Sequence, residues 1–126
     1  MTATMTPRRL KAFSDAWDQG DVDLIMSYFH QDCTFSPSVE DQPGKTFHGK
    51  TEVEAEIRRI LARDADGVSR SAGHVVMGNR GYSEWSIVFE LGDREGELRG
   101  CDLFEFAGDL ILRKDAYRKS ALWLQR

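Results

Sequence analysis

The sequence predicts an α+β fold in which three helices come first and a mainly antiparallel sheet follows. Three observations support this prediction. Apolar residues in the first half recur at helical spacing, those after Gly67 alternate with the period of a strand, and a glycine turn separates each strand from the next. With 126 residues, 40% of them hydrophobic, the chain is expected to form one domain, residues 1–126, around one core.

The first half of the chain predicts three helices and one short strand. Thr6-Pro7 starts the first helix, because proline is favoured at the first helical position, and Gly20 ends it. Asp21 caps a short second helix. The stretch CTFSP, residues 33–37, is typical of a short strand. The third helix is expected to open at the capping box Thr51-Glu52-Val53-Glu54.

The second half predicts four consecutive strands joined by tight turns. Their expected bounds are Val68–Met77, Gly81–Leu91, Glu95–Ala107 and Leu110–Leu122. The turns between them are Gly78-Asn79, Gly92-Asp93 and Gly108-Asp109. We expect the helices to pack on one face of this curved sheet.

Composition and charge argue against several classes of function. The net charge is -4 and the basic residues form no stripe, so we expect no nucleic-acid partner. No apolar run approaches the length of a membrane span, and the N-terminal residues lack the apolar core of a signal peptide, which predicts a cytoplasmic location and no membrane contact. Cys33 and Cys101 are expected to be free thiols, and no metal-ligand spacing is present, so we expect no metal.

The last predicted hairpin carries two aspartates among apolar neighbours. Strand alternation places Asp102 on the face of Trp85 and Phe104, which should be turned toward the helices. A two-residue turn at Gly108-Asp109 then sets Asp102 opposite Asp115. Arg113 and Tyr117 share that face, and moving the turn by one residue at each side changes the partners but keeps all four residues on it. The pattern therefore predicts that the four polar residues line one cavity.

Two carboxyl groups in one apolar pocket indicate acid–base chemistry. Both cannot ionise freely, so one would hold a proton and donate a hydrogen bond while the other accepts. Asp102 and Asp115 are the predicted catalytic pair, in either order of acid and base. The alternative is that Arg113 binds the aspartates in a purely structural network.

Other side chains are candidates for binding a ligand. His74 would share the face of Trp85 if Gly78-Asn79 forms a two-residue turn, and it is either a base or an ordinary sheet residue. Tyr117 is placed to orient a ligand carbonyl. Phe13, Trp17 and Phe104 either shape the pocket or belong to the core.

Three stretches carry a family resemblance: WDQGDVDLIMSYFHQDCTF, TFHGKTEVEAEI and RGCDLFEFAGDLILRKDAY. They resemble the SnoaL-like branch of the superfamily that includes nuclear transport factor 2 and ketosteroid isomerase. The resemblance spans nearly the whole chain. It implies a conical α+β barrel with the helices on the concave face of the sheet, a deep and mostly apolar pocket, and usually a homodimer.

The resemblance implies that this chain has only some of the active-site residues of two related enzyme families. Asp102, ahead of FEFAG, lies where ketosteroid isomerases keep a protonated aspartate in the oxyanion hole. Their oxyanion tyrosine would fall near Phe13 and their general base near Pro37, and neither residue can do that work. Asp115 lies where limonene epoxide hydrolases carry an acid, but their arginine-x-aspartate partner is replaced by residues 83–85, Ser-Glu-Trp.

The expected function is that of a small-molecule pocket protein with cofactor-free acid–base chemistry. Isomerisation, cyclisation, dehydration or water addition on an apolar carbonyl or hydroxyl compound would all fit the predicted pair. The alternatives are a non-catalytic ligand-binding module and a homodimeric interaction domain. We expect no cofactor, a small apolar molecule as ligand, and a second copy bound through the convex sheet face.

Overall fold

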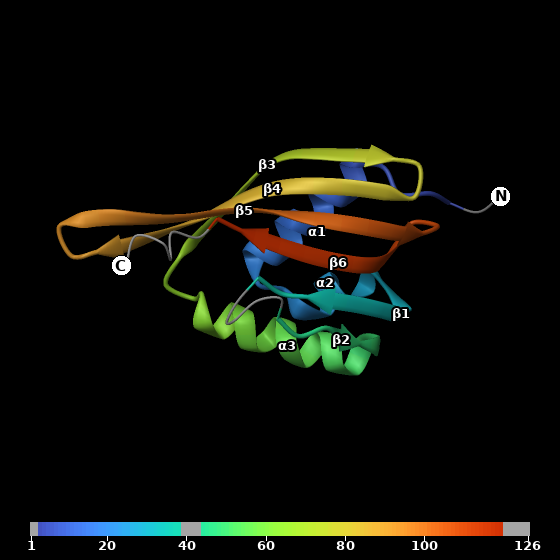
Figure 1. The fold of residues 1–126 in the computed structure, drawn as a ribbon, viewed down its shortest axis with the longest axis horizontal. Coiled ribbons are helices and arrows are strands. Elements are labelled where there is room, and N and C mark those ends of the chain that lie inside the picture. The colour runs from blue at the N-terminus through green and yellow to red at the C-terminus, as the bar shows by residue number, and fades with distance from the viewer. Residues whose placement is uncertain (1–2, 39–43, 120–126) are drawn as a thin grey trace.

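The computed structural model describes residues 3–38 and 44–119. In these residues the chain forms two helices, two strands, a third helix and then four more strands, and all six strands belong to one sheet (Figure 1). The helices are α1 (Pro7–Gln19), α2 (Val22–Ser27) and α3 (Gly49–Arg63). The strands are β1 (Phe29–Ser36), β2 (Phe47–His48), β3 (Val68–Met77), β4 (Arg80–Leu91), β5 (Arg94–Ala107) and β6 (Leu110–Arg118).

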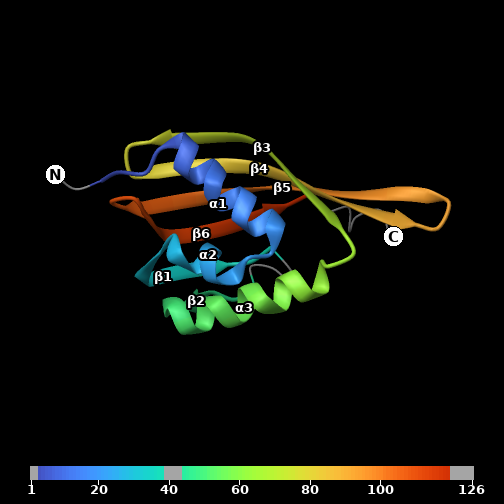
Figure 2. The same ribbon diagram turned by 180° about the vertical axis from the view of Figure 1, so that it is seen from behind.

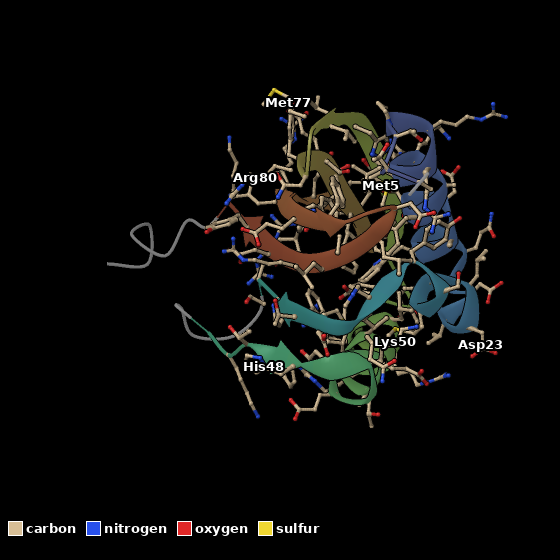
Figure 3. All side chains as sticks on the ribbon, turned by 90° about the vertical axis from the view of Figure 1, so that its right-hand side faces the viewer. Met5, Asp23, His48, Lys50, Met77 and Arg80 are labelled. Atoms are coloured by element: carbon tan, nitrogen blue, oxygen red, sulfur yellow. The ribbon has the colours of Figure 1, made fainter. Side chains whose placement is uncertain are left out.

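The sheet has the strand order β2-β1-β6-β5-β4-β3. Neighbouring strands are antiparallel except β1 and β6, which run parallel. All three helices lie on the same side of this sheet (Figure 2), and Figure 3 shows from the side that the strands curl. The predicted α+β class, with helices on one face of a curved sheet, is confirmed, and the sheet is curled but not closed.

Local sequence signals explain the bounds of the first helix. The Thr6 hydroxyl accepts a hydrogen bond from the Arg9 backbone N–H at 3.1 Å, and Pro7 follows as the first helical residue. Gly20 ends the helix in the left-handed region, with φ 70°, and its N–H donates to the Trp17 carbonyl. Both helix ends were correctly predicted.

Strands β4 and β5 each begin one residue earlier than predicted, and three other elements differ more from their predicted bounds. Helix α3 begins at Gly49, ahead of the predicted capping box, and the Glu52 carboxylate accepts a hydrogen bond from the His48 backbone N–H at 3.1 Å. Strand β1 begins at Phe29 and gains β2 as a partner, because residues 47–48 pair with it. The last predicted strand, 110–122, ends at Arg118, and its part beyond 119 lies outside the described residues.

The core lies between the helices and the sheet. Phe13 of α1 is 2% exposed, and its ring packs edge-on against Phe29 at 5.6 Å and against Phe104 at 6.1 Å between centroids. Ile57 of α3 and Ile111 of β6 are fully buried in the same cluster. Burial of these large side chains fixes the helix layer on the sheet.

Two irregularities decide which side chains face the helices. The pairing of β3 with β4 shifts register between Ala72 and His74, where Gly73 has φ 81°. The pairing of β5 with β6 shifts between Phe106↔Ile111 and Glu105↔Arg113, so that Leu112 is an extra residue in β6. Because strand faces alternate with a period of two, each such bulge exchanges the two faces for the residues that follow it.

Candidate functional site

A cavity of about 90 Å³, open on one side, lies between the helices and the sheet. Its walls are mainly apolar and aromatic, with Phe13 and Trp17 from α1, Phe35 from β1, and Trp85 and Ile87 from β4. The end of α3 also borders it. This volume is smaller than that of the ~150 Å³ apolar cavity that takes up a benzene molecule, so the cavity suits one end of a small organic compound.

A carboxylate with two partners lies in the wall of this cavity. The Asp102 side chain, on β5, is 10% exposed. Its Oδ1 accepts a hydrogen bond from Trp85 Nε1 at 3.2 Å, and its Oδ2 lies 3.2 Å from Lys114 Nζ. A buried carboxylate is stable only where such partners replace water. Asp102 is therefore a negative group held in place on the cavity side of the sheet.

The partner of Asp102 is a lysine that is even less exposed. The Lys114 side chain, on β6, is 6% exposed, and its Nζ lies 4.4 Å from the Trp17 ring centroid and 4.7 Å from that of Phe35. Cation–π contacts of this kind stabilise an ammonium group away from water. An ammonium has three N–H donors, so the contact with Asp102 leaves two for other acceptors.

The bulge in β6 is what brings Lys114 into the cavity. After the extra residue Leu112, Lys114 lies opposite Phe104 and Ala116 opposite Asp102, so both point toward the helices. In a regular hairpin the same positions would have faced away from them. The bulge thus places the Lys114 ammonium beside Asp102, where the Asp115 carboxylate was expected.

The predicted pairing of Asp102 with Asp115 is wrong. Asp115 lies opposite Leu103, which is 43% exposed, and Tyr117 lies opposite Cys101. The prediction assumed an unbroken alternation through β6, and the extra residue reverses it. The structure therefore does not bring Asp115, Arg113 or Tyr117 to the cavity.

These three residues instead form a network on the outer, helix-free face of the sheet. Arg113 Nη2 lies 2.8 Å from Asp115 Oδ2, and the Tyr117 hydroxyl donates to the same oxygen at 3.2 Å. The negative charge of Asp115 raises the pKa of the Tyr117 hydroxyl. On the same face Arg80, labelled in Figure 3, pairs with Glu105 at 3.0 Å, and Arg113 Nη1 lies 3.6 Å from that carboxylate.

The remaining predicted residues divide between cavity and core. Phe13, Trp17 and Trp85 line the cavity, whereas Phe104 is buried in the core and is not among the lining residues. His74 lies on the cavity side of the sheet, as predicted from the two-residue turn, and its Nδ1 is 2.8 Å from the Ser83 hydroxyl oxygen. Burial, and then the nearby Lys11 ammonium, lower the pKa of its ring.

Sequence reasoning missed Lys114, Ser83, Phe35 and Asp18 as cavity residues. For Lys114 a signal was present, because three consecutive charged residues in a strand, 113–115, force at least one onto the inner face. Nothing in the sequence distinguishes Ser83 from the other serines of β3 and β4. Asp18 lies near the C-terminal end of α1, and burial, followed by the charge of Asp15, raises the pKa of its carboxyl group.

Gly100 explains how the Trp85 indole reaches Asp102. Gly100 and Trp85 are cross-strand partners, and a Cβ at Gly100 would collide with the Trp85 ring and with the Tyr117 carbonyl oxygen. With no side chain there, the ring lies across β5 and its Nε1 points at the carboxylate two residues along the strand.

The described residues hold no cluster of three or more His, Cys, Asp or Glu side chains that could bind a metal ion. Both cysteines are free, with Cys33 buried and Cys101 partly exposed. Within residues 3–38 and 44–119, no helix is both long and apolar enough to cross a membrane.

Comparison with known proteins places this geometry in context. A family model described as a SnoaL-like domain matches residues 10–114. No curated protein matches the chain. Many solved structures do, and the three described below are 15–18% identical to this chain, so these likenesses concern the fold alone.

Three of these structures illustrate the likeness. An NTF2-like protein of unknown function from Cytophaga hutchinsonii is 15% identical, with 89% of this chain and 97% of that chain covered and a TM-score of 0.72. An NTF2-like protein of unknown function from Mesorhizobium loti is 18% identical, with 90% and 89% covered and a TM-score of 0.74. A protein of unknown function with a cystatin-like fold from Xanthomonas campestris is 15% identical, with 93% and 92% covered and a TM-score of 0.76.

Proposed function

Because the chain belongs to the SnoaL-like domain family over residues 10–114, we propose that it binds a small, largely apolar molecule in the cavity and performs cofactor-free acid–base chemistry on it. That family includes isomerases and cyclases that need no cofactor. The observation that carries the proposal is the contact between Asp102 and Lys114, a base beside a cation in an apolar cavity.

Asp102 takes the role of general base. Its two oxygens are fixed by Trp85 Nε1 and Lys114 Nζ, and each oxygen keeps a further lone pair that can accept a proton from a ligand. The partners orient the carboxylate without consuming its capacity to accept. A base held in one orientation is what proton abstraction from a bound molecule needs.

Lys114 takes the role of electrostatic stabiliser. When a proton leaves the carbon next to a carbonyl group, negative charge develops on the carbonyl oxygen. An ammonium fixed between Asp102, Trp17 and Phe35 is in place before that charge forms, so it needs no rearrangement to stabilise that charge. The pair therefore suits enolisation of a small apolar ketone or aldehyde.

Deuterium exchange tests this reaction class before any natural substrate is known. Acetophenone is a small apolar ketone, and its methyl protons should exchange for deuterium in D₂O when the protein is present, as followed by proton NMR. The proton moves from the methyl carbon to Asp102, and a deuteron from the solvent-exchanged carboxyl group returns to the carbon.

Matched variants decide the assignment. Asp102→Asn should slow the exchange by roughly 10²–10⁴-fold, the usual contribution of a general base. Asp115→Asn, on the outer face, should leave the rate unchanged. If the two variants behave alike, Asp102 is not the base. If acetophenone binds and no exchange occurs with the wild type, the chain is the non-catalytic binding module that the sequence also allows.

The proposal includes a homodimer through the outer face of the sheet. Val75, Tyr82 and Leu103 form a row across three neighbouring strands there, and each is at least 36% exposed. A contiguous exposed apolar row of this kind on a sheet is typical of an interface. The charged network around Arg113 lies beside it and supplies polar contacts at its rim.

A further inference from the structure

Ser83 and His74 form a polar pair on the cavity side of the sheet that the acid–base proposal leaves without a role. Ser83 is 2% exposed, lines the cavity and lies directly opposite Asp102 on the neighbouring strand. Its hydroxyl oxygen is 2.8 Å from His74 Nδ1. The three residues thus occupy adjacent places in β3, β4 and β5.

The bulge at Gly73 lets His74 share the cavity side of β3 with Ser71 and Ser69. Before it, Ser71 lies opposite Trp85 on the cavity side, and regular alternation would next put Gly73 there and turn His74 outward. The extra residue restores His74 to the cavity side, opposite Ser83. A bulge that re-aims one side chain onto a site is a common device next to binding pockets.

The direction of the hydrogen bond follows from the neighbouring charge. A carboxylate only accepts hydrogen bonds, so next to Asp102 the Ser83 hydroxyl is favoured with its hydrogen toward the cavity and the carboxylate. Its oxygen is then the acceptor from His74, and His74 Nδ1 must carry the hydrogen. The opposite arrangement would turn the Ser83 lone pairs toward a negative group.

We propose that Ser83 is a third polar contact for the ligand of this pocket, and that His74, in the Nδ1–H tautomer, is the positioning residue that turns the Ser83 hydroxyl hydrogen into the cavity. The ligand then carries an oxygen that accepts two hydrogen bonds, one from Ser83 and one from Lys114, as a carbonyl oxygen does. The contact of Ser83 with a ligand oxygen deepens the proposed function and rests on it. The tautomer of His74 is independent of the proposed function.

The tautomer is tested by long-range proton–nitrogen NMR of the ¹⁵N-labelled protein at pH 7.5, where the lowered pKa keeps the His74 ring neutral. His74 should show a protonated Nδ1 and a bare Nε2. His30 is an internal control that should show the opposite tautomer. Its Nδ1 accepts a hydrogen bond from the Asp32 backbone N–H at 3.0 Å, so its ring hydrogen must be on Nε2. A protonated Nε2 on His74 would overturn the inference.

The ligand contact is tested with two probes of similar shape, acetophenone and α-methylstyrene, of which only the first has a carbonyl oxygen. Ser83→Ala should weaken acetophenone binding by about five-fold, the effect of one hydrogen bond, and leave α-methylstyrene unchanged. Ser69→Ala, in the same cavity wall but opposite Ile87, is the control and should change neither.

The positioning role of His74 is tested by two substitutions. His74→Asn keeps a donor at nearly the place of Nδ1 and should preserve acetophenone binding, whereas His74→Leu should weaken it as much as Ser83→Ala does. A loss with both substitutions, or with neither, would contradict the role. If acetophenone fails to bind the wild type, the enolisation proposal and the Ser83 contact are both overturned, and the NMR tautomer alone decides the role of His74.

Discussion

Lys114 Nζ lies 3.2 Å from Asp102 Oδ2, on the face of the sheet that the helices cover. Both side chains are nearly excluded from solvent, so each charge depends on the other. Removing one partner of such a pair leaves an uncompensated buried charge, which costs more than the pair itself contributes.

This dependence predicts a strong coupling between the two residues. Lys114→Met should lower the free energy of unfolding by about 3–5 kcal/mol, because the Asp102 carboxylate loses its cation. The double variant Asp102→Asn/Lys114→Met should be more stable than Lys114→Met alone. Urea unfolding of the four proteins gives the coupling energy, and strictly additive effects would show that the two charges act independently.

The outer-face pair Arg113 and Asp115 is the matched control for the Asp102–Lys114 measurements. The Arg113 side chain is 41% exposed, so water and salt screen its contact with Asp115. Arg113→Met should therefore cost about 1 kcal/mol or less. A cost equal to that of Lys114→Met would contradict the screening of this contact by water and salt.

Gly100→Ala should displace the Trp85 indole. The new methyl group would meet the ring and the Tyr117 carbonyl oxygen, and overpacking of this kind costs about 1–3 kcal/mol. The indole would also lose its hydrogen bond to Asp102, which should change the Trp85 fluorescence and slow deuterium exchange. Ala72→Gly, on the outer side of β3, is a control that leaves the ring in place. An unchanged fluorescence spectrum in Gly100→Ala would contradict the predicted contact.

His74 should make the fold less stable in mild acid. Its pKa in the folded protein is lowered from the ordinary value of 6.5, so the unfolded chain binds a proton more readily than the folded one. The neutral His74 ring makes its full contribution to the free energy of unfolding above pH 6.5. This contribution is lost as the pH falls from 6.5 through the pKa of His74 in the folded protein. His74→Asn should flatten this part of the curve of unfolding free energy against pH. An identical slope in the variant between pH 7 and 5 would contradict the assignment.

The homodimer proposal predicts a dimeric mass in sedimentation analysis. Leu103→Asp places a charge in the exposed row of the outer face and should shift the protein toward monomer. Leu24→Asp, on α2, changes a leucine of similar exposure, 41% against 43%, and should leave the mass unchanged. Monomeric wild-type protein at high concentration would contradict the proposal.

The sequence was sufficient for the fold because its signals are local and repeated. Proline and glycine mark the ends of α1, and the turn after Ala107 was placed to the residue, with Ala107 opposite Leu110. The face assignment in β4 and most of β5 followed from alternation alone. These features depend on periodicity and turn chemistry, which a single sequence displays.

The candidate site was predicted only in part, because its β6 side depends on a single-residue irregularity. No glycine or proline marks the bulge at Leu112, and the run of apolar residues 110–112 fits either register. The error therefore exchanged Lys114 for Asp115 while leaving Asp102 and Trp85 correctly placed. The bulge at Gly73 carries a glycine, but the face of His74 was fixed independently by the turn at 78–79.

The extra residue in β6 also gives this fold an unusual route of divergence. If Leu112 paired with Glu105 and the bulge were lost, the rest of the strand would shift by one place, so that Asp115 would face the cavity and Lys114 would face outward. The chemistry of the pocket would change from a base beside a cation to two adjacent acids without any substitution among its polar residues. Relatives that have this bulge and relatives that lack it can therefore carry opposite charges at the same place, and alignments made without gaps will pair residues that face opposite ways.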